Sequence, residues 1–129
     1  YIASLSTIGS HCFIAPEVTV TNDNFMGRTE ERKKHFEGIT IADGGRVGAN
    51  VTTLPGRYIA RDGVVAAGSV VTRDGPAEYI VSGIPARLFK SVPREQLLDS
   101  EPEKIETSDI MTSQIDVFIQ EKVTANGQH

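Results

Sequence analysis

The chain has 129 residues, enough for one modest core, and its 13 Lys and Arg against 17 Asp and Glu give a net charge of −4. This mild acidity argues against a nucleic-acid binder. The single cysteine, Cys12, excludes an internal disulfide and favours a reducing, cytoplasmic location. No stretch approaches the roughly 18 apolar residues of a membrane span. Few aromatic residues (6%) and 12 Gly favour stacked short strands over a helical bundle.

In two runs of positions spaced by six, nine of ten residues are Ile or Val. The series comprises Ile2, Ile8, Ile14 and Val20, and then Ile41, Val47, Thr53, Ile59, Val65 and Val71. The next residue is small in every case except Leu54, and in the second run the third residue after each is Gly, Asn or Asp. A period of six fits neither a helix nor an alternating strand. We therefore expect an all-β prism, with one inward side chain and one tight corner in each hexapeptide.

Four segments carry a resemblance to a known family: IGSHCFIAPEVTVTND, GGRVGANVTTLPG, VVAAGSVVTRD and IVSGIPARLFK. They resemble the hexapeptide-repeat acyltransferases, and most closely the N-acetyltransferases of nucleotide-linked amino sugars. The resemblance covers about residues 2–90, and Gly83-Ile84-Pro85-Ala86-Arg87 is its most diagnostic part. It implies a left-handed parallel β-helix, acetyl-CoA as co-substrate, and a homotrimer with active sites between neighbouring subunits.

These patterns divide the chain into a β-helix over residues 1–90 and a C-terminal helical tail over residues 91–129. The start at Tyr1, in the middle of a repeat, predicts a β-helix truncated at its N-terminus. Residues 93–98 are typical of a short helix with Pro in its first turn, and the resemblance implies that it folds back on the prism. Apolar spacing predicts another helix over residues 108–123, with a strand through residues 117–119 as the alternative.

The repeat is interrupted between Val20 and Ile41, so a loop of about residues 21–38 is inserted. Long loops in compact domains are often functional, and the resemblance implies that this one covers the active site. In the amino-sugar branch a Thr-Asn-Asp sequence here borders the substrate amine, which points to Thr21, Asn22 and Asp23. We expect Asn22 to orient the amine and Asp23 to accept its proton, directly or through water. The alternative is that Asn22-Asp23-Asn24 only begins a turn.

The other candidate side chains favour structural roles. Histidine is a common base in the family, but His11 lies in the corner register, His35 in a charged loop and His129 at the chain end. A carbonic anhydrase built on this prism needs three converging histidines, which this pattern lacks, so no metal site is predicted. Cys12 occupies a small, inward-leaning position and is expected to pack in the core.

Small residues at the corners predict the acetyl-CoA site, because they let an extended pantetheine arm lie against the backbone. The predicted lining is Gly48, Ala49, Ala67 and Gly68. Cations for the phosphates are expected where the family places them, at Arg73, Arg87 and Lys90.

The resemblance and these residues together predict an acetyl-CoA-dependent N-acetyltransferase. Its acceptor would be the amino group of a nucleotide-linked sugar, in the synthesis of surface-polysaccharide or glycan precursors. Two alternatives remain open. One is an O-acetyltransferase of a sugar or another small acceptor, and the other is a non-enzymatic β-helix that serves as a trimerisation or scaffold module.

Overall fold

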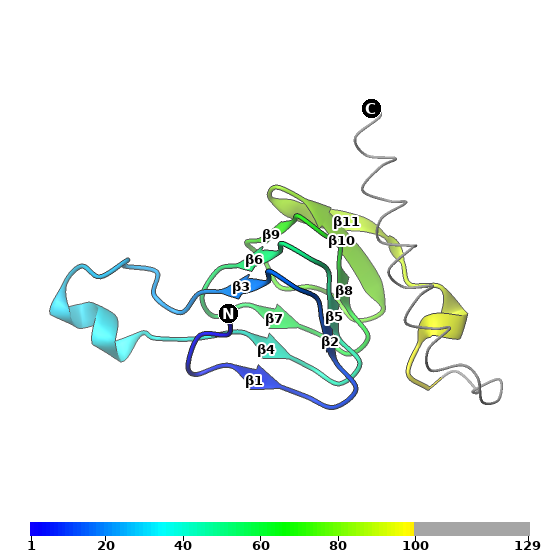
Figure 1. Ribbon diagram of the computed structural model, residues 1–129, viewed down its shortest axis with the longest axis horizontal. Coiled ribbons are helices and arrows are strands. Elements are labelled where there is room, and N and C mark those ends of the chain that lie inside the picture. Colours follow the sequence, from blue (N-terminus) through cyan, green and yellow to red (C-terminus); the bar gives the residue numbers. More distant parts are fainter. Residues whose placement is uncertain (100–129) are drawn as a thin grey trace.

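The computed structural model describes residues 1–99 of the chain as a three-sided prism of short parallel strands (Figure 1). The predicted helix over residues 108–123, the rest of the predicted tail from residue 100, and His129 lie outside the described residues. The division of the chain at residue 90 stays a prediction. Among residues 1–99, no helix is long and apolar enough to cross a membrane.

Nine two-residue strands form three successive coils, each with one strand on every face of the prism. They are β1 (Thr7–Ile8), β2 (Phe13–Ile14), β3 (Thr19–Val20), β4 (Thr40–Ile41), β5 (Arg46–Val47), β6 (Thr52–Thr53), β7 (Tyr58–Ile59), β8 (Val64–Val65) and β9 (Val70–Val71). Two longer strands, β10 (Tyr79–Gly83) and β11 (Ala86–Ser91), form an antiparallel hairpin. Two 3-10 helices, η1 (Glu30–Lys34) and η2 (Arg94–Gln96), lie in the loop and after β11.

The three faces are separate sheets, with strand orders β1-β4-β7, β11-β10-β8-β5-β2 and β3-β6-β9. We call them sheets A, B and C in that order. Thr40 pairs with Tyr58 above it and with Thr7 below it, so a coil takes 18 residues without an insertion and 33 with the loop. The predicted all-β prism with a period of six is therefore confirmed.

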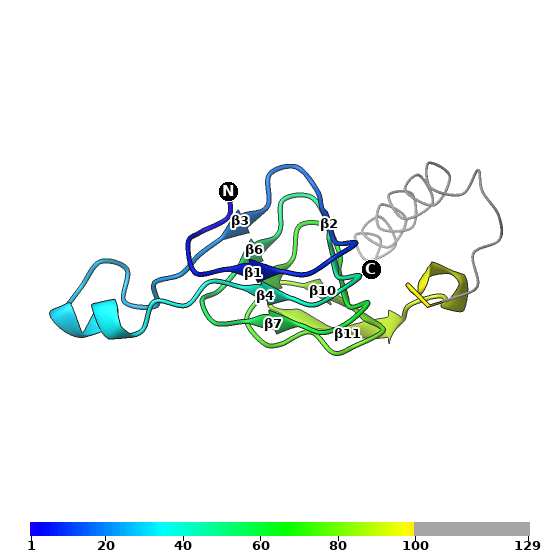
Figure 2. The ribbon, with the colours of Figure 1, turned by 90° about the horizontal axis from the view of Figure 1, so that it is seen from below.

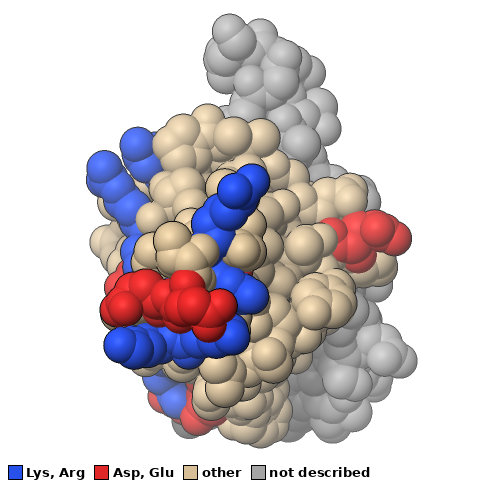
Figure 3. Space-filling model, turned by 90° about the vertical axis from the view of Figure 1, so that its left-hand side faces the viewer, with Lys and Arg blue, Asp and Glu red and all other residues tan. Residues whose placement is uncertain are grey.

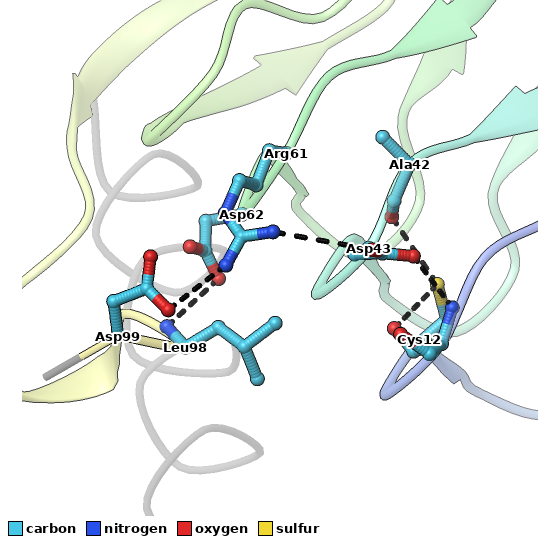
Figure 4. Close-up of polar contacts among 8 residues, drawn as sticks. Cys12, Ala42, Asp43, Arg61, Asp62, Leu98 and Asp99 are labelled. Atoms are coloured by element: carbon cyan, nitrogen blue, oxygen red, sulfur yellow. Dashed lines mark hydrogen bonds and ion pairs between the residues drawn. The ribbon is translucent and has the colours of Figure 1, made fainter.

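The residues at every sixth position form the core. From Val20 to Val71 every member of the series is at most 2% exposed. Ile2 and Ile8 are 39% and 40% exposed, because the first coil lies at the edge of the prism. Cys12 packs against this core as expected, and burial raises the pKa of its thiol, whose Sγ donates to Ala42 O at 3.3 Å (Figure 4).

The corners have left-handed backbone, which explains their composition. Eight residues of the corner register have φ between 54° and 75°, and these are Leu5, His11, Glu17, Gly44, Asn50, Gly56, Asp62 and Gly68. Gly, Asn and Asp adopt this conformation at the least cost. Asp74, the last member of the predicted series, does not have a positive φ. Its carboxylate instead accepts a hydrogen bond from Tyr58 N at 3.0 Å.

Sheet B is covered by the segment that follows β11. Val92 and Leu97 pack against Val64 and Ile80 on the outer side of this sheet. At the corner between sheets A and B, Leu98 N donates to Asp62 Oδ1 at 3.1 Å, and Arg61 contacts both Asp99, at 3.0 Å, and Asp43, at 3.9 Å (Figure 4). The short 3-10 helix η2 lies in this segment, which agrees with the expected helix folding back on the prism.

The first residue of each short strand points outward, so its exposure tells whether that face of the prism is covered. The outward residues of β5 and β8 in sheet B are buried, whereas those of sheets A and C are exposed or half-buried. The described residues thus cover one face of the prism and leave the other two accessible.

Thr53 is the polar member of the inward series, and its Oγ1 is buried without a hydrogen-bond partner among residues 1–99. A buried, unpaired hydroxyl is unfavourable, and valine has the same shape without it. We predict that Thr53→Val raises the free energy of unfolding by about 1 kcal/mol in urea denaturation. Thr52→Val, on the outward side of the same strand, is the control and is expected to change it by less than about 0.5 kcal/mol. Equal effects of the two substitutions would contradict the prediction.

Candidate active site

The inserted loop projects from the corner between sheets C and A, after β3 and before β4 (Figure 1). It lies on the side of the prism opposite the segment that covers sheet B (Figure 2). Acidic and basic side chains lie next to each other on the side from which the loop projects (Figure 3). Within residues 22–37 no residue is buried, and the half-buried ones are Asn22, Asp23, Arg32 and Phe36. The loop therefore contributes no buried residue of its own between residues 22 and 37.

The Asn22 side chain is fixed at the base of the loop. Its Nδ2 donates to the backbone oxygen and to the Oγ of Ser4, both at 3.2 Å. Its backbone oxygen accepts from Glu37 N at 3.2 Å, which joins the two ends of the loop. The backbone oxygen of Ser4 can only accept a hydrogen bond, so the Asn22 atom that faces it must be the Nδ2 donor. The remaining polar atom of the side chain, Oδ1, is then an acceptor. This geometry allows Asn22 to orient a donor such as an amine.

The Asp23 carboxylate begins a turn. Its Oδ1 accepts from Phe25 N at 2.9 Å, and its Oδ2 accepts from Gly27 N at 2.8 Å and lies 3.6 Å from Arg32 Nη1. Partial burial acts to raise the pKa of Asp23, but the Gly27 and Phe25 amides and Arg32 outweigh it and hold that pKa below its usual value. Asp23 is therefore a weak base in this structure, and proton acceptance by it stays a prediction.

The two described histidines lie elsewhere. His11 is an exposed corner residue with φ 54°, as the corner register predicts. His35 is also exposed, with Nε2 3.2 Å from Glu31 Oε1 and its ring 5.9 Å from that of Phe25. Within residues 1–99, no group of three His, Cys, Asp or Glu is arranged to hold a metal ion.

The four small residues predicted to line a cofactor groove meet at the corner between sheets B and C. Gly68 N donates to Ala49 O at 2.8 Å, and a Cβ on Gly48 would lie 2.6 Å from Ala67 N. Gly48 is buried, whereas Ala49 and Ala67 are half-buried and Gly68 is exposed. The missing side chain of Gly48 makes room for the next coil, and its place in the lining of a groove stays a prediction. Ala49, Ala67 and Gly68 are the more accessible of the four residues, and their contact with a cofactor also stays a prediction.

The three predicted cations share the upper end of the prism but not a face. Arg73 follows β9 of sheet C, whereas Arg87 and Lys90 lie on β11 of sheet B, opposite Ser82 and Ile80. All three are exposed. The structure therefore places two of them on one strand and the third at another corner.

Two residues at the base of the loop were not predicted. Ser4 lies 18 residues before Asn22, which is the length of one coil. Residues spaced by one coil lie next to each other, so this spacing could have predicted the contact. Arg32 contacts Asp23 and Phe36 inside the loop, where there is no repeat to indicate which side chains meet.

Comparison with known proteins identifies relatives among acetyltransferases. Galactoside O-acetyltransferase of Escherichia coli (strain K12) is 34% identical over 89 residues, which are 67% of this chain and 44% of that protein. The 2,3,4,5-tetrahydropyridine-2,6-dicarboxylate N-acetyltransferase of Clostridium perfringens (strain SM101 / Type A) is 50% identical over 52 residues, 40% of this chain and 22% of that protein. No family model matches the chain. The chain spans less than half the length of these two relatives.

Solved structures define the fold class as a left-handed parallel β-helix. A galactoside acetyltransferase in complex with coenzyme A matches with a TM-score of 0.56 and 28% identity, covering 78% of this chain and 52% of that one. The N-acyltransferase AntD from Bacillus cereus, in complex with dTDP and coenzyme A, shares the fold with a TM-score of 0.57 and 20% identity, covering 74% and 57%. The repeat and the fold of the chain are similar to those of the hexapeptide-repeat acyltransferases, and the relatives that it matches are acetyltransferases.

Proposed function

We propose that this chain functions in acetyl transfer from acetyl-CoA to the amino group of a nucleotide-linked sugar. The observation that carries the proposal is the Asn22 amide, which Ser4 holds at the base of the inserted loop, while no hydrogen bond from residues 1–99 reaches its Oδ1. The family supports the acetyl donor, since the galactoside acetyltransferase that matches in structure binds coenzyme A. The relative from Clostridium perfringens supports nitrogen as an acceptor atom in the family.

Acyl transfer to an amine requires a neutral, oriented nitrogen, because only its lone pair can attack the thioester carbonyl carbon. In our proposal Asn22 Oδ1 accepts one N–H of the amine and turns the lone pair toward that carbon. The C–N bond then forms, the C–S bond breaks, and the thiolate leaves. Asp23 is held ionised by its donors, so in our proposal the amine proton leaves through water beside this carboxylate, and the leaving thiolate gains a proton to become the free thiol.

The other parts of the proposal concern the cofactor and the assembly. The corner formed by Ala49, Ala67 and Gly68 would receive the pantetheine arm, and Arg73, with Arg87 and Lys90 on β11, would face the phosphates. The accessible sheets A and C flank the loop, which supports a homotrimer with shared sites. We place the reaction in the cytoplasm, in the synthesis of surface-polysaccharide or glycan precursors.

Release of free thiol from acetyl-CoA tests the function directly. We expect turnover with UDP- or dTDP-linked amino sugars and none with the same nucleotide sugars carrying a hydroxyl in place of the amine. The 34% identity to galactoside O-acetyltransferase favours sugar O-acetylation as the second candidate. Turnover on galactosides but not on amines would replace the first proposal by the second. Absence of turnover on every acceptor would leave the scaffold interpretation.

A further inference from the structure

The loop is held by a polar contact between its two ends and not by a hydrophobic core. Arg32 lies on η1, with Nη1 3.6 Å from Asp23 Oδ2 at the beginning of the loop. The centre of its guanidinium is 5.4 Å from the ring of Phe36 at the end of the loop. These three side chains and Asn22 are the half-buried residues within residues 22–37. Arg32 therefore bridges the start and the end of the loop.

We propose that Arg32 is a positioning residue for the acceptor side of the site, because it holds the base of the loop closed around Asn22. This inference rests on the function proposed above. Asp23, the partner of Arg32, is covalently next to Asn22, and Phe36 precedes Glu37, whose N–H bonds to Asn22 O at 3.2 Å. Arg32 thus contacts the chain neighbour of each of the two residues, Asn22 and Glu37, that join the ends of the loop.

The closed end of the loop is in turn attached to the prism. Gly56 N, in the corner of the next coil, lies 3.1 Å from Glu37 O and 3.0 Å from Gly38 O. The Asn22 side chain is attached to Ser4 on the other side. The coils therefore hold the two ends of the loop in place, whereas Arg32 joins these ends to each other from within the loop.

Arginine is suited to this position by its shape. A planar guanidinium can pair with a carboxylate at its edge and stack on an aromatic ring with its face, whereas a lysine ammonium offers only a point charge. The pair is partly exposed, with side chains 29% and 18% accessible, so its contribution to the stability of the whole prism is small. Its effect is expected on the loop alone.

Lys33 supplies the matched control. It carries the same charge on the same 3-10 helix, but it pairs within that helix, with Glu30 Oε2 at 2.8 Å, and its side chain is 59% exposed. The test compares Arg32→Ala, Arg32→Lys and Lys33→Ala with the unmodified chain. Two quantities are measured for each: steady-state kinetics of thiol release, and hydrogen exchange of the Phe25 and Gly27 amides, which bond to Asp23.

We expect Arg32→Ala to raise KM for the amino-sugar acceptor about tenfold or more, with KM for acetyl-CoA and Tm unchanged. Exchange of the two amides should accelerate, Arg32→Lys should restore part of both effects, and Lys33→Ala should match the unmodified chain. A changed KM with unaltered amide exchange would overturn the proposal, since Arg32 would then act by touching the substrate. Equal effects of Arg32→Ala and Lys33→Ala would also overturn it.

The two proposals fail separately. If the unmodified chain shows no turnover with any amine, the proposed function fails, and exchange of the Phe25 and Gly27 amides still decides whether Arg32 closes the loop. If turnover is normal and Arg32→Ala changes neither the acceptor KM nor the exchange, the function stands and the positioning role is wrong.

Discussion

Gly48→Ala is expected to lower the free energy of unfolding by about 3 kcal/mol, the upper range for overpacking a core. A Cβ at this position would lie 2.6 Å from the backbone nitrogen and 2.9 Å from the Cα of Ala67, and 3.1 Å from Val65 O. These are backbone atoms of the next coil, so no side-chain rotation relieves the contact. Gly48 N also donates to Val65 O at 2.9 Å, which fixes the separation of the coils. Urea denaturation of the variant measures the effect.

Gly68 is the control for this prediction, because a methyl group added there would contact no other atom of residues 1–99. Among the described residues, a Cβ there would have nothing within 4 Å, so the expected cost arises from the φ of 74°. Gly68→Ala is therefore expected to cost about 1 kcal/mol. Gly68→Asn should cost less, since Asn50 occupies the same corner one coil below with φ 58°. A loss of stability in Gly48→Ala no larger than that in Gly68→Ala would show that the coils can separate to admit a methyl group.

The repeat made the prism predictable, because each inward residue meets its counterpart in the next coil and the same constraint acts at every sixth position. The left-handed φ of His11 follows from this register although histidine is not a typical corner residue. The small size of Gly48 predicts both its position at a corner and a place in a cofactor groove. A small residue permits close approach of either a ligand or a neighbouring coil, and the sequence does not say which.

Contacts outside the repeat were not predictable in the same way. Arg46 stands at an outward position, yet it is 5% exposed because the segment after β11 covers sheet B, where Gln96 Oε1 accepts from its Nη1 at 3.4 Å. The six-residue repeat predicts that the side chain of Arg46 points outward. It does not predict which face of the prism another segment of the chain will cover. Inside the loop no period exists, so the meeting of Asp23, Arg32 and Phe36 depends on a fold of the loop that the spacing does not encode.

The second large effect is expected in activity. Asn22→Ala removes the amide oxygen that orients the amine and should lower kcat/KM for the amino-sugar acceptor about 100-fold, as losses of single orienting or stabilising groups do. Ser4→Ala is the matched control, because it removes one of the two acceptors of Asn22 Nδ2 and leaves the other, the Ser4 backbone oxygen. A loss of only about threefold is expected there, since the amide keeps a hydrogen bond of modest net strength.

Asp23→Asn separates the two roles that the base of the loop combines. It removes the charge that faces Arg32 and one carboxylate oxygen, but it keeps one acceptor for the turn amides of Phe25 and Gly27. If Asn22 orients the amine and Asp23 serves the turn, Asp23→Asn should lose less activity than Asn22→Ala when thiol release is measured on variants with unchanged Tm. The reverse order would assign proton transfer to Asp23 despite its low pKa. Full turnover in Asn22→Ala would leave the reaction in place but move the acceptor site away from the base of the loop.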